Sequence, residues 1–89
     1  MLHIAPEAML ERQFLALGLG DYVRADLHPT RPEYERINIE KMPFANERFE
    51  LIVCNHVLEH VNDPARALAE FHRCLKPGGL LLAQTPYAP

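Results

Sequence analysis

The strongest constraint on the fold is a strand, helix, strand pattern in the second half of the chain. Phe49 to Cys54 is an almost continuous apolar run, which is typical of a central strand covered on both faces. Asp63 and Pro64 then indicate a helix start, because aspartate can cap a helix and proline suits its first position. Lys76 to Gly79 is expected to end that helix. The chain then re-enters the sheet as Leu80 to Gln84, which makes this stretch a unit of an open α/β protein.

The helix that begins at Pro64 is predicted to be amphipathic. Leu68, Phe71 and Leu75 recur at helical spacing, so we expect them to form the face that packs on the sheet. The other side of the same helix carries charged side chains that are expected to face water, namely Arg66, Glu70 and Arg73.

A similar pattern begins the chain. Leu2 to Ala5 is a short apolar run that stops at Pro6, and proline is well placed as the first residue of a helix. Leu10, Phe14 and Leu17 then recur at i, i+4 and i+7, which predicts one apolar stripe. We expect this helix to cover one face of the sheet.

Two further strands are predicted between these units. Tyr22 to Leu27 alternates polar and apolar side chains, which is typical of a strand and places Asp26 at its carboxyl end. His28 to Glu35 contains two prolines and is predicted to be a loop. Arg36 to Ile39 is a candidate for a brief third strand.

Strands that alternate with helices predict an α/β fold with a mainly parallel, Rossmann-like sheet and helices on both faces. The chain of 89 residues is long enough for a single domain, spanning residues 1–89. Sheets of this kind bind ligands beyond the carboxyl ends of their strands. We therefore expect a small-molecule site at that edge of the sheet.

Composition narrows the possible partners and the location. The formal net charge of −3 argues against a nucleic-acid backbone or an anionic membrane as the main partner, because both favour a basic face. The longest apolar runs are far shorter than the roughly 20 residues that span a bilayer, and the N-terminal residues do not form a signal-peptide pattern. Cys54 and Cys74 lack metal-ligand or disulfide spacing. A soluble, cytoplasmic protein is expected.

Polar groups follow three of the predicted strands. They are Ala5-Pro6-Glu7 after the first, Asp26 at the end of the second, and Asn55-His56 after the fourth. A carboxylate at the end of the second strand can accept hydrogen bonds from a ribose diol. The alternative interpretation is that Asp26 is only a turn residue before His28-Pro29.

Several segments together resemble the class I S-adenosylmethionine-dependent methyltransferases of the small-molecule type, which carry a methyltransferase type 11-like domain. The segments that carry the resemblance are ADLHP from Ala25, KMPF from Lys41, FELIVCNHVLEHV from Phe49 and RCLKPGGLLLAQTP from Arg73. The resemblance implies the strand order 3-2-1-4-5, S-adenosylmethionine as cofactor, and methyl transfer to a small molecule or another acceptor that the sequence does not identify. A non-catalytic nucleotide-binding or interaction module of the same fold is the alternative.

The resemblance also implies roles for individual residues. Asp26 would bind the ribose hydroxyls and Leu27 would pack against adenine. Asn38 would accept a hydrogen bond from the adenine amino group, and Ile39 would supply a backbone N–H. Asn55 and His56 would face the methionine part of the cofactor, with His56 also a candidate proton acceptor. The full predicted cofactor-binding set is Ala5, Pro6, Glu7, Asp26, Leu27, Asn38, Ile39, Asn55 and His56.

The first strand departs from the family pattern. The family has an acidic residue and two glycines there, whereas this chain has His3, Ala5 and Glu7 at those positions. Either Glu7 pairs with the cofactor's ammonium group, or the methionine end of the site is degraded. The family also continues with two strands that this chain is expected to lack. Leu80 to Gln84 would then be an apolar sheet edge, which predicts self-association.

Two alternative interpretations assign metal binding to some of the same residues. His56, Glu59 and His60 fit the HxxEH pattern of inverted zinc peptidases, but we expect Glu59 and His60 to lie in the turn after the fourth strand. A ligand set of Cys54, His56, His72 and Cys74 is also conceivable on paper. Residues two apart on a helix point in different directions, so we expect a buried Cys74 and an exposed His72 instead, and no metal.

Overall fold

The computed structural model describes residues 1–18, 20–55 and 61–84 of the chain. Within those residues it contains five strands and two helices, in the order β1-α1-β2-β3-β4-α2-β5. The strands are β1 (Leu2–Ile4), β2 (Val23–Asp26), β3 (Glu35–Arg36), β4 (Phe49–Asn55) and β5 (Leu75–Gln84), and the helices are α1 (Ala8–Ala16) and α2 (Pro64–Cys74).

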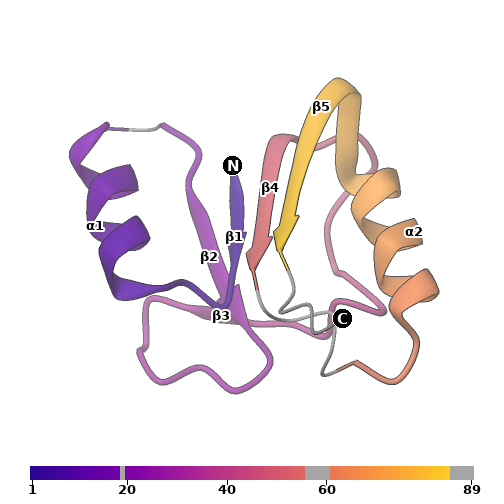
Figure 1. Ribbon diagram of the computed structural model, residues 1–89, viewed down its shortest axis with the longest axis horizontal. Helices are drawn as coiled ribbons and strands as arrows, with labels where there is room; N and C mark the ends of the chain where they lie inside the picture. Colours follow the sequence, from indigo (N-terminus) through magenta and orange to yellow (C-terminus); the bar gives the residue numbers. More distant parts are fainter. Residues whose placement is uncertain (19, 56–60, 85–89) are drawn as a thin grey trace, which may run out of the picture.

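The five strands form one sheet in the order β3-β2-β1-β4-β5. Every neighbouring pair is parallel, so all the strands end at the same edge (Figure 1). His3 in the central strand β1 pairs with Arg24 of β2 on one side and Val53 of β4 on the other. The predicted fold class and strand order are confirmed.

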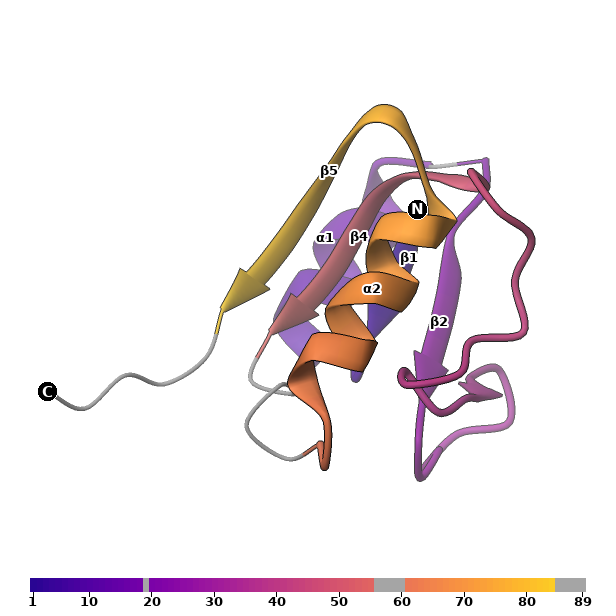
Figure 2. The ribbon, with the colours of Figure 1, turned by 90° about the vertical axis from the view of Figure 1, so that its right-hand side faces the viewer.

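The two helices lie on opposite faces of the sheet (Figures 1 and 2). The main core fills the space between α2 and the sheet, and β1, β4, α2 and the segment before β4 contribute to it. Its largest fully buried side chains include Phe49 and Phe71. Neither described helix is long and apolar enough to cross a membrane.

Helix α2 begins as predicted and buries a different face from the one expected. The Asp63 side chain accepts a hydrogen bond from the Arg66 backbone N–H at 3.2 Å, and Pro64 is the first helical residue. Ala67, Phe71 and Cys74 are the buried residues, whereas Leu68 is 43% exposed. The prediction for Leu68 was wrong because the helix is rotated so that the small side chains Ala67 and Cys74 meet the sheet.

The residues that follow α2 form the first part of β5, which contains a bulge. Leu75 pairs with Phe49, and Leu80 pairs with Leu51, so the residues between Leu75 and Leu80 form a bulge. Gly78 has φ +79°, and a Cβ on Gly79 would lie 2.9 Å from the Lys76 carbonyl oxygen. The predicted helix end was therefore too late: α2 ends at Cys74 and β5 begins at Leu75 rather than at Leu80, because Leu75 pairs with Phe49 of β4 instead of continuing the helix.

Helix α1 differs from its prediction in two respects. It begins at Ala8 rather than at Pro6, and Leu17 lies just beyond its end with 69% of its surface exposed. Its buried residue is Glu11, which is 3% exposed and forms an ion pair with Arg24 at 2.9 Å. The predicted apolar stripe is therefore only partly buried, and α1 contacts β2 through this ion pair as well.

Strand β3 is shorter and earlier than predicted, covering Glu35–Arg36 instead of Arg36 to Ile39. Ile37 and Ile39 are buried, but Asn38 turns the chain out of the sheet. Its side-chain oxygen accepts from the Glu40 N–H at 2.9 Å, and its carbonyl accepts from the Lys41 N–H at 2.9 Å. These local bonds replace a sheet ladder at this point.

Candidate functional site

A cavity of about 380 Å³ lies at the carboxyl ends of β1 and β2. It is lined by residues 4–5 at the end of β1, 26–28 at the end of β2, 37–40 after β3, and 61–62 before α2. Four segments that are distant in sequence thus meet where the parallel strands end. This is the edge at which open α/β sheets bind ligands.

Five of the predicted cofactor-binding residues line this cavity: Ala5, Asp26, Leu27, Asn38 and Ile39.

The other predicted positions do not contribute to the described lining. Pro6 and Glu7 are absent from the cavity wall, and Glu7 is exposed. Asn55 is the last residue of β4, but its side chain lies outside the described residues. His56, Glu59 and His60 also lie outside them.

Six lining residues were missed by the sequence prediction: Ile4, His28, Ile37, Glu40, Val61 and Asn62. The apolar ones are core residues whose edges reach the cavity, and a hydrophobic pattern does not distinguish such positions from the rest of the core. His28 and Glu40 directly follow the predicted residues Leu27 and Ile39, so extending each predicted segment by one residue would have included them.

Asp26 forms a turn, as one interpretation of its sequence position predicted, and it also lines the cavity. It is the last residue of β2 and is partly buried. One carboxylate oxygen, Oδ1, accepts a hydrogen bond from the His28 N–H at 3.2 Å, which is an Asx turn. The backbone carbonyl accepts from the Ile37 N–H at 3.0 Å, which ties β2 to the start of the opposite cavity wall. A carboxylate has two oxygens and several lone pairs, so the turn leaves acceptor capacity at the cavity.

Asn38 is likewise engaged in its own turn. The Oδ1 atom of Asn38 accepts from the Glu40 N–H, as assigned from the hydrogen-bond network. An amide oxygen has a second lone pair, so the turn does not prevent the acceptor role expected for this residue.

Ala5 adopts a backbone conformation that normally favours glycine. Its φ is +49°, in the left-handed region where the Cβ of an L-residue is crowded. Its N–H donates to the Ala25 carbonyl at 2.7 Å, which continues the β1–β2 ladder by one residue. The chain therefore makes a left-handed turn at a position where the family pattern has glycine, but with an alanine.

His3 lies in β1, next to the lining residue Ile4, and does not itself line the cavity. It is 1% exposed, its Nδ1 lies 2.7 Å from the Tyr22 hydroxyl, and its ring meets Phe14 of α1 edge-on. Burial lowers the pKa of His3, and the charges of Glu11 and Glu7 only partly offset this. The residue at the family's acidic position is thus a buried histidine that favours the neutral form.

Comparison with known proteins decides the family. The family model described as a methyltransferase domain matches residues 9–83. The chain belongs to the methyltransferase domain family. The cofactor of such methyltransferases is S-adenosylmethionine.

Individual relatives of this methyltransferase domain are longer proteins. A tRNA U34 carboxymethyltransferase of Nautilia profundicola is 31% identical over 80 residues, which cover 90% of this chain and 24% of that protein. The ubiquinone/menaquinone biosynthesis C-methyltransferase UbiE of Klebsiella pneumoniae is 44% identical over 50 residues, covering 56% of this chain and 20% of that protein. The chain thus spans about a quarter or less of the length of these curated relatives.

Solved structures share the fold. Protein BH2331 of Bacillus halodurans C-125 superposes with a TM-score of 0.81 at 28% identity, over 99% of this chain and 45% of that one. An S-adenosylmethionine dependent methyltransferase from Mesorhizobium loti gives 0.75 at 22% identity, over 92% and 44% of the respective chains.

The alternative metal sites gain no support from the residues that the structure describes. Within that part of the methyltransferase domain, no three histidine, cysteine or acidic side chains gather as a metal site would require. Cys74 is buried and His72 is exposed, as expected, and burial raises the pKa of the Cys74 thiol.

Proposed function

We propose that this chain binds S-adenosylmethionine in the cavity beyond β1 and β2 and forms the cofactor-binding part of an enzyme that transfers a methyl group. The observation that carries the proposal is the position of Asp26, at the end of β2 and on the cavity wall, in a chain of the methyltransferase family.

The chemistry of the lining fits an adenosine group. Asp26 offers carboxylate oxygen to a ribose diol, and each such charge-assisted hydrogen bond contributes on the order of 1.5–3 kcal/mol. Ile4, Ile37 and Ile39 supply apolar walls, which suit the faces of a purine ring. Leu27 is 52% exposed at the cavity, where a bound base would cover it.

The described residues give less support for binding of the methionine end of the cofactor than for binding of its adenosine end. The left-handed turn at Ala5 brings backbone to the cavity without the family's glycine. Glu7 is exposed and does not line the cavity, so its proposed pairing with the ammonium group requires the bound cofactor to reach beyond the described lining. The role of His56 as a proton acceptor also stays a prediction, because that residue lies outside the described residues.

When bound, the cofactor supplies a methyl group on a sulfonium, from which a nucleophile of the acceptor takes the methyl carbon while the carbon–sulfur electron pair stays with sulfur. The chain's own contribution is positioning, which aligns the two reactants and can supply several kcal/mol, on the order of 7 or more for well-oriented groups. Asp26 would hold the sugar, and the apolar walls would hold the base.

The methyl acceptor belongs to the whole protein rather than to this segment. The relatives that match parts of this chain carry different names: one is a tRNA U34 carboxymethyltransferase and another a ubiquinone/menaquinone biosynthesis C-methyltransferase. A segment common to both is best explained by the cofactor that methyltransferases share, which also makes a non-catalytic module the less favoured alternative.

Calorimetry with S-adenosylmethionine and S-adenosylhomocysteine tests the proposal. We expect Asp26→Ala to weaken binding by about tenfold or more, because a charge-assisted hydrogen bond is lost. Asp21→Ala is the matched control, since Asp21 is exposed and precedes the same strand at its other end, and it should leave the affinity unchanged. Absence of heat with either ligand, or unchanged binding by Asp26→Ala, would overturn the assignment.

A further inference from the structure

One wall of the cavity is a segment with little sheet structure to hold it. Residues 37–40 line the cavity but follow a strand of only two residues. From there the chain runs to Phe49 without forming another strand. The Ile37 N–H binds the Asp26 carbonyl of β2, but beyond Ile37 the position of the segment depends on contacts from outside the sheet.

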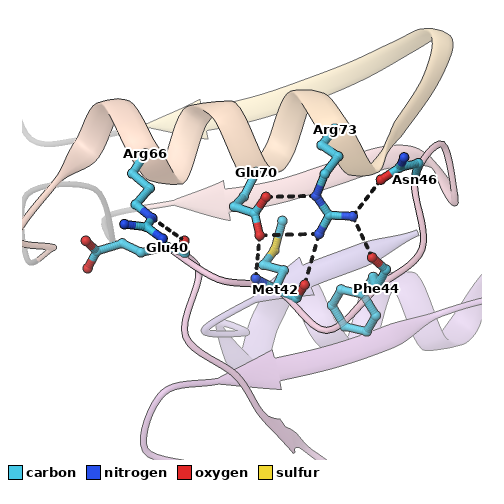
Figure 3. Close-up of polar contacts among 7 residues, drawn as sticks. All are labelled: Glu40, Met42, Phe44, Asn46, Arg66, Glu70 and Arg73. Atoms are coloured by element: carbon cyan, nitrogen blue, oxygen red, sulfur yellow. Dashed lines mark hydrogen bonds and ion pairs between the residues drawn. The ribbon is translucent and has the colours of Figure 1, made fainter.

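Helix α2 provides the fixing contacts, as Figure 3 shows. All five N–H groups of the Arg73 guanidinium are used. The two N–H groups of Nη1 donate to the Phe44 carbonyl and to Asn46 Oδ1, both at 2.8 Å. An N–H of Nη2 donates to the Met42 carbonyl at 2.9 Å. The remaining donors bind the two oxygens of Glu70 at 2.8 and 3.3 Å.

Glu70 joins this arrangement from the same helix. Its Oε1 accepts a hydrogen bond from the Met42 N–H at 2.7 Å. Met42 therefore has its N–H bound by Glu70 and its carbonyl bound by Arg73. A planar guanidinium has a rigid fork of donors that a lysine ammonium lacks, so this geometry requires arginine at position 73. Both side chains were expected to face water, and that expectation was wrong.

Arg66 extends the contact to the cavity wall itself. Its Nε donates to the Glu40 carbonyl at 3.2 Å, and Glu40 lines the cavity. At the far end of the segment, the Glu47 and Arg48 N–H groups donate to the Arg73 and Cys74 carbonyls, both at 2.9 Å. One helix thus holds the segment at its start, middle and end.

We propose that Arg66, Glu70 and Arg73 form a clamp that positions the cavity wall at Asn38 to Glu40 and thereby sets the affinity for the adenine part of the cofactor. The three are positioning residues, because none of them lines the cavity. The inference rests on the proposed function, since the readout is binding of the same cofactor.

The variants Arg66→Ala and Arg73→Lys test the clamp. Arg73→Lys keeps the charge and loses the fork. We expect Arg66→Ala to weaken S-adenosylhomocysteine binding by about three- to tenfold and Arg73→Lys by about tenfold, because one and several hydrogen bonds are lost respectively. His72→Ala, an exposed neighbour on the same helix, is the matched control and should bind like the original chain.

A double-mutant cycle separates positioning from simple stabilisation. If the clamp acts through the wall, the effect of Arg66→Ala should largely disappear when Asn38 is already alanine, whereas it should persist in full in the Asp26→Ala background. A merely structural role would lower the free energy of unfolding and leave the affinity of the folded chain unchanged. Wild-type affinity in both clamp variants, or full additivity of Arg66→Ala with Asn38→Ala, would overturn the proposal.

Hydrogen exchange without ligand keeps the two proposals distinguishable. The amides of residues 40–42 should exchange faster in Arg73→Lys than in the original chain and in His72→Ala, because the clamp holds this segment. If the original chain bound no cofactor, the proposed function would fail while this measurement still tested the clamp. Unchanged exchange at these amides would contradict the clamp whatever the binding result, and Arg66→Ala provides the same readout if Arg73→Lys does not fold.

Discussion

At the scale of single residues, Ala5 and His3 show how this chain accommodates its departures from the family pattern. Ala5 takes a positive φ of 49° that glycine would adopt without steric cost. His3 replaces an acid and is buried against Tyr22 and Phe14. Neither departure destroys the turn that leads into the cavity, since Ala5 still lines it.

Replacing Ala5 with glycine is predicted to stabilise the fold. Left-handed backbone costs an L-residue roughly 1–2 kcal/mol, and the extra freedom of glycine in the unfolded chain offsets part of the gain, so we expect a net increase of up to about 1 kcal/mol in the free energy of unfolding. Urea denaturation measures it. Ala69→Gly, at an exposed position inside α2, should instead lose about 1 kcal/mol. A loss of that size in Ala5→Gly as well would show that the turn is not strained.

His3 is predicted to make stability depend on pH. Burial lowers its pKa below the ordinary 6.5, so on acidification the unfolded chain takes up a proton before the folded chain does. The stabilisation is therefore complete above pH 6.5 and declines as the pH falls through that value toward the lowered pKa.

Denaturation at about pH 7.5 and 5.5 measures this effect, because carboxylates contribute mainly below that range. His3→Gln, which retains hydrogen-bonding groups without titrating, should lose less stability between the two pH values than the original chain. His72→Gln should keep the original loss. An identical loss in all three proteins would exclude His3 as its source.

At the scale of elements, local signals were predictable and long-range polar contacts were not. The start of α2 followed from Asp63 and Pro64, because a capping side chain and its target lie three residues apart. The orientation of Arg73 did not follow, since its backbone acceptors lie 29 and 31 residues away and carry no mark in the sequence. The sequence pattern of charged residues on an amphipathic helix is the same whether their side chains face water or bind a loop.

The same reason explains the error in α1. The periodicity of Leu10, Phe14 and Leu17 suggested an apolar face, but the ion pair between Glu11 and Arg24 is visible only once α1 and β2 are placed together. Burial alone would raise the pKa of Glu11, but hydrogen bonds from Arg24 and Tyr34 and the nearby arginine charges lower it overall. The cost of burying such a carboxylate is offset by hydrogen-bonding and charged partners on other elements.

At the scale of the whole molecule, the parallel sheet could be predicted from the order of its elements, whereas the strand order and the cavity-lining residues Asp26, Leu27, Asn38 and Ile39 were predicted through the family resemblance. Parallel topology follows from alternating strands and helices, and the carboxyl ends of parallel strands converge whatever their exact lengths. The cavity position was therefore robust to errors of one or two residues in β2 and β3.

The outer edge of β5 is predicted to cause self-association. Among the described residues, β5 is the outermost strand of the sheet. Leu80 and Leu82 on it are 64% and 53% exposed, and an exposed apolar edge of this kind pairs with other chains. We expect the apparent mass in sedimentation to rise with concentration, and Leu80→Lys with Leu82→Lys to suppress the rise. Met9→Lys, at a residue of α1 that is 70% exposed, should not. A single monomeric species at every concentration would contradict the prediction.

The central claim is that the adenosine part of S-adenosylmethionine occupies the cavity beyond β1 and β2. The most direct test is an NMR titration of the labelled chain with S-adenosylhomocysteine, following the backbone amides. The account predicts the largest shifts at residues 4–5, 26–28 and 37–40, which line the cavity, and little change at residues 75–79, around the bulge at the opposite end of the sheet. Saturable binding with its largest shifts away from the cavity, or no shifts at saturating ligand, would contradict it.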